Sequence, residues 1–399
     1  MGFRHFPRAF AITTPLLWLA GVFLAPTAAA APPAAVAVGF DREQLQPLLA
    51  QGFARRPEAR PVGFDDPVRI ASISKLVVAL GVMRLVEAGQ LELDRDVSYY
   101  LGWKLRNPAF PKAPVTLRML LAHRAGVVDG AGYVIPFDVT LREWMAEADR
   151  WDPAHAPGEA PFAYANLNTP VIATVVERAT GERFDRAMER LVFAPLGVEA
   201  CFNWTGCSEG FARRAVTLYR HGGEVAADDR SAGIPPCTVV AARDGSCDLA
   251  RYVPGTNASI FSPQGGLRIS MLDLARIGQA IARREAGFLS TSSWDELARP
   301  AGPRPDGESF FCSFGLSMQI TGTDPACADD FFRDGRARIG HAGEAYALRS
   351  GLWVDPVTGR GIAFFVTEVP VIEGADADAI APAEYAIVRR ALEALEPAG

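Results

Sequence analysis

The sequence predicts an α/β protein, a mixed antiparallel sheet domain that is flanked by helices and interrupted by a large, mainly helical insertion. Apolar runs with strand character lie near the N-terminus and again toward the C-terminus. The middle of the chain combines helical periodicity with Gly- and Pro-rich loops. This order indicates an α/β part at about 31–90 and 285–399 around a mainly helical part at about 91–284.

Local patterns predict the individual elements. Residues 35–40 form a strand, and 67–71 lead into a helix at 72–88 that is apolar on nearly every face, as is typical of a buried helix. Gly89 is suited to end that helix. Further helices are expected at 116–123, 140–148, 169–180, 184–192, 270–284 and 382–395, and further strands at 313–321, 345–354 and 360–366, the last two joined by a hairpin turn at 355–359.

The composition excludes intrinsic disorder and disfavours a nucleic-acid partner. The 399 residues are 49% hydrophobic and 22% charged, which provides enough apolar side chains for a sizeable core. The formal net charge is −6 and no run of five like charges occurs, so no basic binding stripe is expected. Only three residues are lysines, which makes each lysine position informative; they are Lys75, Lys104 and Lys112.

Residues 1–30 have the pattern of a secretory signal peptide. Arg4 and Arg8 precede an apolar stretch at 9–24, and small residues follow up to Ala30. That stretch is shorter than the roughly twenty residues of a membrane-spanning helix. We therefore expect a mature domain, 31–399, that is periplasmic or secreted and has no stable membrane span after cleavage.

Cysteine usage agrees with export. The six cysteines form three close couples, Cys201 with Cys207, Cys237 with Cys247, and Cys312 with Cys327. Six cysteines allow fifteen pairings, but the clustering favours three local disulfides, which persist in an oxidising compartment. None of the spacings is that of a metal-binding C-x-x-C motif, so we expect no metal and no other cofactor.

The sequence Ser72-Ile73-Ser74-Lys75 is the sharpest candidate for chemistry. Three residues apart on a helix, the hydroxyl and the amine share one face, with Cβ atoms about 5–6 Å apart. A serine becomes a nucleophile when a base takes its proton, and a buried lysine with a lowered pKa can be that base. Lys75 is the only charged residue between Ile70 and Met83, which favours burial. The competing interpretation is a lysine that reaches solvent from a helix N-terminus.

Two further segments could complete such a site. Tyr164 and Asn166 lie in a loop before an apolar helix, where a phenol can relay a proton and an amide can hold a lysine or a substrate carbonyl. His341, Gly343 and Glu344 precede a predicted strand, where glycines let backbone N–H groups approach a ligand and form an oxyanion hole. Each segment alone is also compatible with a packed loop tyrosine or a glycine turn with a surface histidine.

Together and in this order, the three segments resemble the serine β-lactamase and penicillin-binding-protein superfamily. The similarity is greatest to its β-lactamase-related branch, which includes class C β-lactamases, D-amino acid amidases and carboxylesterases. Further sequence fits that branch, TLRMLLAHRAG at 116–126, YANLN at 164–168 and SPQGGLRIS at 262–270. The resemblance spans about residues 65–395 and implies the β-lactamase/transpeptidase-like fold.

The resemblance implies an exported serine hydrolase that forms an acyl-enzyme on Ser72. Lys75 and Tyr164 would share the proton transfers, and which of them is the acylation base stays open. Asn166 would steady Lys75 and the substrate, and the backbone N–H groups of Ser72 and Glu344 would form the oxyanion hole. The substrate would be a small ester, amide or β-lactam-like molecule; the sequence leaves the oligomeric state open.

His341 would line the pocket where β-lactamases of this superfamily have the lysine of K-T-G; this chain has His341-Ala342-Gly343. A lysine presents a fixed cation to a substrate carboxylate. A histidine with a pKa of about 6.5 is mostly neutral at about pH 7.5 and would donate only a neutral hydrogen bond. With Glu344 nearby, this favours small neutral esters, or amides that bear a free amine, over penicillins.

Two other functions stay open at this point. A penicillin-binding-type sensor domain that acylates slowly or not at all would have the same fold, although such a domain is expected to lose Ser72, Lys75 or Tyr164. The sequence GCSEG at 206–210 matches the G-x-S-x-G motif of α/β-hydrolases, which would make Ser208 the nucleophile. No apolar strand precedes that motif, as the α/β-hydrolase fold requires.

The cysteine pattern is testable by peptide mapping of the exported protein under non-reducing conditions. We expect three local crosslinks, 201–207, 237–247 and 312–327, and no free thiol. Each closed loop would add about 2–3 kcal/mol of stability by restricting the unfolded chain. Free thiols, or a long-range link between Cys201 and Cys327, would contradict this prediction.

Overall fold

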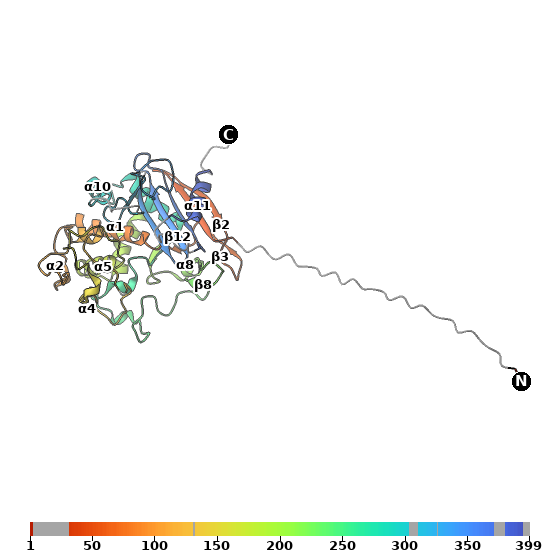
Figure 1. Cartoon of the computed structure of the whole chain (residues 1–399), viewed down its shortest axis with the longest axis horizontal. Helices are drawn as coiled ribbons and strands as arrows, with labels where there is room; N and C mark the ends of the chain where they lie inside the picture. Colours follow the sequence, from red (N-terminus) through yellow and green to blue (C-terminus); the bar gives the residue numbers. More distant parts are fainter. Residues whose placement is uncertain (3–31, 131, 303–309, 325, 371–379, 394–399) are drawn as a thin grey trace. The chain divides into compact units, whose positions relative to one another are not determined.

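The computed structural model describes residues 1–2, 32–130, 132–302, 310–324, 326–370 and 380–393 (Figure 1). The signal peptide expected at 1–30 lies outside the described residues, apart from its first two. The chain divides into two compact units, 1–31 and 32–399, and all described secondary structure belongs to the second. No helix in the described part of the chain is long and apolar enough to cross a membrane.

The largest sheet combines strands from both ends of the second unit. Its order is β10-β11-β12-β13-β1-β2, and every neighbouring pair is antiparallel. The N-terminal hairpin pairs with the C-terminal strands through β1 and β13, with Ala35 opposite Val366. Figure 1 shows the N-terminal strands in orange-red beside the C-terminal strands in blue. The predicted fold class, α/β with an antiparallel sheet and flanking helices, is confirmed.

The strands are β1 (Ala35–Phe40), β2 (Leu45–Gln51), β3 (Phe53–Arg55), β4 (Arg60–Pro61), β5 (Val68–Arg69), β6 (Ala200–Phe202), β7 (Leu218–Tyr219), β8 (Val225–Ala227), β9 (Leu267–Ile269), β10 (Gln319–Thr321), β11 (Arg338–Ala345), β12 (Leu348–Val354) and β13 (Gly361–Val366). Besides the largest sheet they form the small sheets β3-β4, β5-β9-β6 and β7-β8.

The α-helices are α1 (Ile73–Glu87), α2 (Ser98–Leu101), α3 (Leu117–Leu121), α4 (Leu141–Trp144), α5 (Asn168–Thr180), α6 (Phe184–Met188), α7 (Ala194–Leu196), α8 (Glu209–Arg214), α9 (Met271–Arg283), α10 (Thr291–Ala298) and α11 (Pro382–Glu393). Short 3₁₀ helices are η1 (Ala148–Arg150), η3 (Leu249–Arg251) and η4 (Ala258–Phe261), and η2 (Glu189–Phe193) is a π-helical turn.

Two strands of the largest sheet are not predicted by local sequence patterns. β2 contains Pro47, which lacks an N–H group, and it occupies the sheet edge where such a residue is tolerated. β11 reads RIGHAGEA and has no apolar alternation, but it pairs with β10 on one side and β12 on the other. The glycine loop expected around His341 is therefore a strand. Conversely, the strand expected at 313–321 is limited to β10.

Both faces of the largest sheet are covered by helices. Val36 and Val38 belong to the core on the side of α9, whereas Ala35 and Ala37 belong to the core on the side of α11. This division follows from the alternation of side chains along a strand. The sequence assigned the α9 segment, 270–284, to the helical part, yet α9 contacts β1, β12 and β13. The sheet and the helical part therefore share one continuous core.

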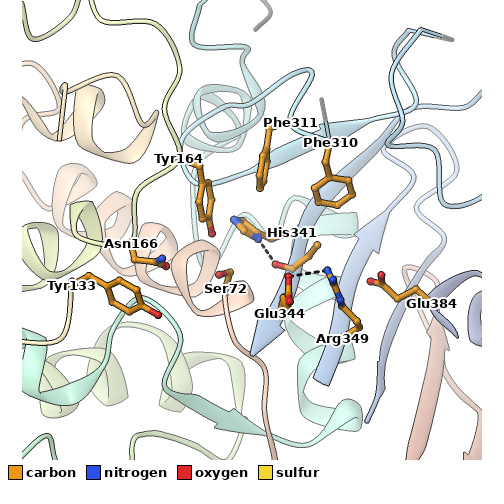
Figure 2. A pocket seen from close by; sticks show the side chains of 12 residues that line it. Ser72, Tyr133, Tyr164, Asn166, Phe310, Phe311, His341, Glu344, Arg349 and Glu384 are labelled. Atoms are coloured by element: carbon orange, nitrogen blue, oxygen red, sulfur yellow. Dashed lines mark hydrogen bonds and ion pairs between the residues drawn. The ribbon is translucent and has the colours of Figure 1, made fainter. Parts of the chain in front are cut away.

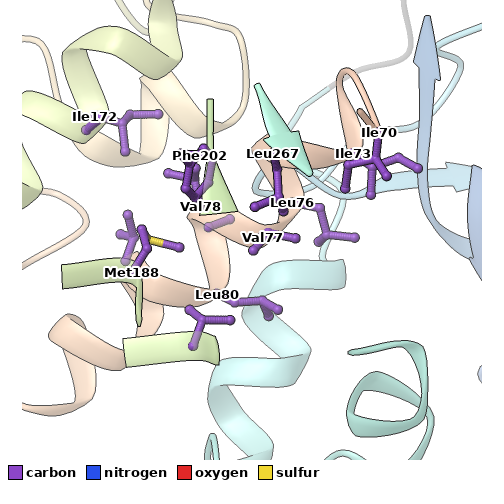
Figure 3. Packing of buried hydrophobic residues seen from close by; sticks show 14 of the residues in the cluster. Ile70, Ile73, Leu76, Val77, Val78, Leu80, Ile172, Met188, Phe202 and Leu267 are labelled. Carbon is purple, nitrogen blue, oxygen red and sulfur yellow. The ribbon is translucent and has the colours of Figure 1, made fainter. Parts of the chain in front are cut away.

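Helix α1 is enclosed on all sides, as its apolar sequence predicts (Figure 3). It contacts β11 and β12 of the sheet and also α5, α6, η2 and α10. Gly81 lets Met188 of α6 approach closely, because a Cβ there would lie 2.8 Å from the methionine sulfur. A helix packed in this way gives the residues at its N-terminal end a rigid position.

The six cysteines lie in the three local pairs that the sequence suggests. The Cα atoms of Cys201 and Cys207 are 5.4 Å apart, those of Cys237 and Cys247 are 5.7 Å apart, and those of Cys312 and Cys327 are 6.1 Å apart. These separations are within the range that a disulfide spans.

A glycine is required where β11 passes the chain segment before α1. A Cβ on Gly343 would clash with the carbonyl oxygen of Ile70 and with Ser350 Oγ. We expect Gly343→Ala to lower the free energy of unfolding by about 1–3 kcal/mol, the usual cost of overpacking, as measured by urea denaturation. The control is Gly210→Ala in α8, where a Cβ would meet only Arg214 Nη1 at 3.9 Å and should not destabilise. Equal stabilities of the two variants would refute the close approach.

Candidate active site

Ser72 stands where a short strand turns into the buried helix α1. β5 ends at Arg69, and Ala71 has a left-handed backbone conformation with a φ of 49° directly before the serine. A residue with a Cβ adopts that conformation at a cost, and such outliers gather at functional sites. The turn leaves Ser72 partly exposed at the wall of a cavity, while Ile73 and the residues after it are buried.

The amine of Lys75 is enclosed by three oxygen atoms. Nζ lies 3.0 Å from Ser72 Oγ, and it donates to Asn166 Oδ1 at 2.8 Å and to the backbone carbonyl of Gln264 at 2.9 Å. The amide and carbonyl oxygens can only accept, so two N–H bonds of the amine point toward them. In the neutral amine the lone pair then faces the hydroxyl of Ser72.

Burial gives this amine an unusual pKa. Lys75 is 1% exposed, and the loss of water around the ammonium lowers its pKa to about 7, while the charge of Asp129 acts in the opposite direction. A large fraction of the amine is therefore neutral near pH 7 and able to accept a proton. The alternative interpretation, a lysine that reaches solvent, is wrong.

Asp129, which no sequence pattern singled out, orients Asn166. Its Oδ2 accepts from Asn166 Nδ2 at 3.0 Å, and its Oδ1 accepts from the backbone N–H of Leu167 at 2.9 Å. Because the amide nitrogen of Asn166 is held in this way, its oxygen must face Lys75. The carboxylate thus acts on Lys75 twice, through the orientation of Asn166 and through its own charge.

Tyr164 belongs to a stack of rings beside Lys75. His123 stacks on one face, with ring centroids 4.5 Å apart, and Phe311 stacks on the other at 4.7 Å. The Lys75 Nζ atom lies 4.9 Å from the centroid of the Tyr164 ring. His123 is buried, and its burial and the nearby Lys75 hold its pKa well below the usual range. The stack therefore keeps the Tyr164 ring beside the amine without adding another charge.

Strand β11 forms the opposite wall and carries the predicted residues 341–344. His341 is fully buried, and burial lowers its pKa to about 3, so the ring is neutral. Its Nδ1 lies 2.6 Å from the carbonyl oxygen of Ala342, which can only accept, so Nδ1 carries the proton and Nε2 carries a lone pair. The expectation that His341 donates a hydrogen bond to the substrate is therefore wrong, because the ring presents an acceptor.

These groups line one cavity of about 220 Å³ (Figure 2). The lining residues are Ser72, Tyr133, Tyr164, Asn166, Phe310, Phe311, His341, Ala342, Gly343, Glu344, Arg349 and Glu384. All the predicted site residues are among them except Lys75, which lies behind Ser72. Arg349 of β12 and Glu384 of α11 had no sequence motif to indicate them. Arg349 forms an ion pair with Glu344 at 3.0 Å, so the charge of Glu344 is balanced rather than directed at the substrate alone.

Ser208 of the alternative motif has no triad around it. Its Oγ accepts from the backbone N–H of Phe211 at 3.1 Å, which caps helix α8, and donates to Glu199 Oε1 at 3.1 Å. In the described part of the chain no imidazole contacts this hydroxyl. The α/β-hydrolase interpretation is therefore wrong.

Comparison with known proteins agrees with this geometry. The family model described as Beta-lactamase matches residues 24–387. Esterase EstB of Burkholderia gladioli is 31% identical over 318 residues, which make up 74% of this chain and 76% of the esterase.

Two solved structures show the same fold. The D-amino acid amidase from Ochrobactrum anthropi SV3 complexed with L-phenylalanine has a TM-score of 0.66 at 18% identity, covering 91% of this chain and 93% of its own. The octameric penicillin-binding protein homologue from Pyrococcus abyssi has a TM-score of 0.66 at 21% identity, covering 91% of this chain and 73% of its own. With a family model matched over most of its length, the chain belongs to the Beta-lactamase family and is a serine hydrolase of that family.

Proposed function

We propose that this protein is an exported serine hydrolase that cleaves small esters or amides through an acyl-enzyme on Ser72. The arrangement of the Lys75 amine carries the proposal. Two of its N–H bonds are committed to Asn166 and Gln264, and the remaining position faces Ser72 Oγ at 3.0 Å. A neutral amine so placed is a base directed at the hydroxyl proton.

Acylation then proceeds by two proton transfers and one exchange of bonds at the substrate carbonyl carbon. Lys75 Nζ takes the proton of Ser72 Oγ while Oγ bonds to the substrate carbonyl carbon, whose electron pair moves onto the carbonyl oxygen. The tetrahedral intermediate collapses and releases the alcohol or amine, which takes the proton from the Lys75 ammonium directly or through the Tyr164 phenol. Water then attacks the ester of Ser72 and gives a proton to the same base, and the acid is released as the hydroxyl is restored.

The negative oxygen of the intermediate needs donors that are already in place. We assign this role to the backbone N–H groups of Ser72 and Glu344, because β11 contacts α1. The contact of Gly343 with Ile70 supports this assignment, because it lets the strand approach the serine closely. Such preorganised donors typically contribute about 3–4 kcal/mol to transition-state stabilisation.

The cavity favours small substrates that lack a carboxylate. Its volume is about 220 Å³, Phe310 and Phe311 supply apolar surface, and His341 supplies no positive charge. This supports esters or amides over penicillins as substrates. A similar protein is named an esterase and a structural neighbour an amidase, so both leaving groups occur among proteins like this one. The three cysteine pairs support export, because disulfides persist in oxidising compartments.

The nucleophile can be identified with an active-site-directed fluorophosphonate probe. We expect labelling of the wild type and of Ser208→Ala, and no labelling of Ser72→Ala, because the Ser72 hydroxyl faces an amine and the Ser208 hydroxyl faces a carboxylate. Fluorophosphonate labelling of Ser72→Ala would contradict the proposal. Labelling without turnover of p-nitrophenyl butyrate would instead favour the sensor function.

The pH dependence of activity tests the role of Lys75. Because the amine must be neutral to accept a proton, kcat/KM for p-nitrophenyl butyrate should rise with pH through a midpoint at about 7. Asp129 raises the pKa of Lys75, so Asp129→Asn should move the midpoint to lower pH. Asp295→Asn, an exposed site on α10, is the control and should leave the midpoint in place. An upward shift, or none, in Asp129→Asn would rule out this electrostatic coupling.

A further inference from the structure

Two acceptors on the cavity wall have no hydrogen-bond partner among the described residues. One is Nε2 of His341, which is completely buried. The other is Oε1 of Glu384, a side chain that is 2% exposed; its second oxygen, Oε2, accepts from the backbone N–H of Ala381 at 2.7 Å and so caps α11. A buried acceptor without a partner, such as His341 Nε2, is unfavourable until a donor reaches it. Both residues line the same cavity as Ser72.

The charges around Glu384 do not neutralise it. Two charged groups act on it, Arg349 from β12 and Glu344 from β11, and these two form an ion pair with each other at 3.0 Å. The pKa of Glu384 is raised to about 7, mainly by burial and to a smaller extent by the charge of Glu344, while the Ala381 N–H and Arg349 oppose the shift. No ion pair to Glu384 occurs in the described part of the chain. Above about pH 7 the cavity therefore contains a carboxylate that forms no ion pair with any described residue.

Figure 2 shows how these groups are arranged along the cavity. His341 lies beside Tyr164, with ring centroids 6.3 Å apart, so its lone pair is near the reaction centre. Glu384 lies beyond Arg349, on the side away from Ser72. A substrate that satisfies both acceptors must therefore carry one hydrogen-bond donor near the scissile bond, for His341, and a second donor farther along the cavity, for Glu384.

We infer that the cavity binds an amine-bearing ester or amide, with Glu384 as the counter-ion of its ammonium group and His341 Nε2 as an acceptor for an N–H or O–H donor closer to Ser72. This inference rests on the proposed function and names its substrate class. An ammonium group brings both the positive charge and the donors that Glu384 lacks. A substrate carboxylate in the same place would face a second carboxylate, and at His341 it would face a lone pair.

The test uses two matched substrate pairs that place the amine on either side of the scissile bond. The first pair is β-alanine methyl ester and its N-acetyl derivative. The second is 2-dimethylaminoethyl butyrate and its uncharged isostere, 3-methylbutyl butyrate. Alkyl ammonium groups of this kind stay largely charged at neutral pH. We expect kcat/KM for the charged member of at least one pair to exceed that of its neutral partner by about tenfold or more, as a charge-assisted hydrogen bond provides.

Two further measurements assign any preference to Glu384. Glu384→Gln keeps an acceptor for the Ala381 N–H but has no charge, so the ratio of kcat/KM within the pair should fall toward one. The matched control is Glu393→Gln, an exposed carboxyl on the same helix, which should keep the wild-type ratio. In the wild type the ratio should also rise with pH through about 7 as Glu384 ionises. The titration of Lys75 affects both members of a pair and cancels in the ratio.

The outcomes separate this inference from the proposed function. Hydrolysis of the neutral esters with no preference for the charged ones would overturn the amine site and leave the serine hydrolase intact. A preference that persists in Glu384→Gln would overturn the role of Glu384. Failure of every ester, together with failure of fluorophosphonate labelling, would overturn the proposed function itself.

Discussion

The buried amine of Lys75 is the group on which the rest of the site depends. An amine removed from water is costly unless each of its hydrogen-bonding positions is matched, and here three oxygen atoms match them. Those oxygens come from Ser72 on the same helix, from Asn166 before α5 and from Gln264 before β9. The fold must therefore hold three distant chain segments within hydrogen-bond distance of one nitrogen. In return, burial brings the pKa of that nitrogen to about 7, where it can act as a base.

The segment 264–266, which supplies the Gln264 oxygen, is held in place by charged side chains. Lys75, Arg69 and Arg268 each donate to one of the three successive backbone carbonyls at 264–266. Asp228 binds both arginines and balances their charge in a buried setting. A buried ion cluster of this kind is weak evidence for stability, but it leaves the backbone between the charges little freedom to move. The carbonyl that meets Lys75 is thus held in place by contacts outside the cavity.

Burial, with a smaller effect of mutual repulsion, limits the number of charges near the reacting atoms. Burial lowers the pKa values of both His123 and His341, and the proximity of Lys75 lowers them further. Both imidazoles therefore stay neutral, and of these three bases only Lys75 titrates near pH 7. Because the Nδ1–H of the neutral His341 ring faces the carbonyl oxygen of Ala342, its Nε2 is an acceptor and not the donor that the sequence suggested. The selectivity of the cavity then depends on groups farther out, on Arg349 with Glu344 and on Glu384.

Much of the fold and of the reaction centre follows from short-range patterns. The apolar sequence of α1 predicts its burial, the three-residue spacing places Ser72 and Lys75 on one helix face, and the turn at 355–359 predicts the hairpin of β12 and β13. These features depend on residues a few positions apart, whose geometry is set by the backbone itself. The cysteine pairs are also local, at sequence separations of 6, 10 and 15, so each requires only a short loop to close.

Features that depend on contacts between residues far apart in the sequence could be found only in the tertiary structure. β11 lacks any apolar alternation and is a strand because β10 and β12 pair with it. Asp129 and Glu384 carry no motif, and each acquires its role from segments far away in the sequence, Asp129 from Asn166 and Glu384 from the cavity wall. The tautomer of His341 depends on the direction of one backbone carbonyl and on complete burial. A pattern of residue types contains the chemistry available to a site, but distance, burial and the direction of each lone pair exist only once the chain is folded.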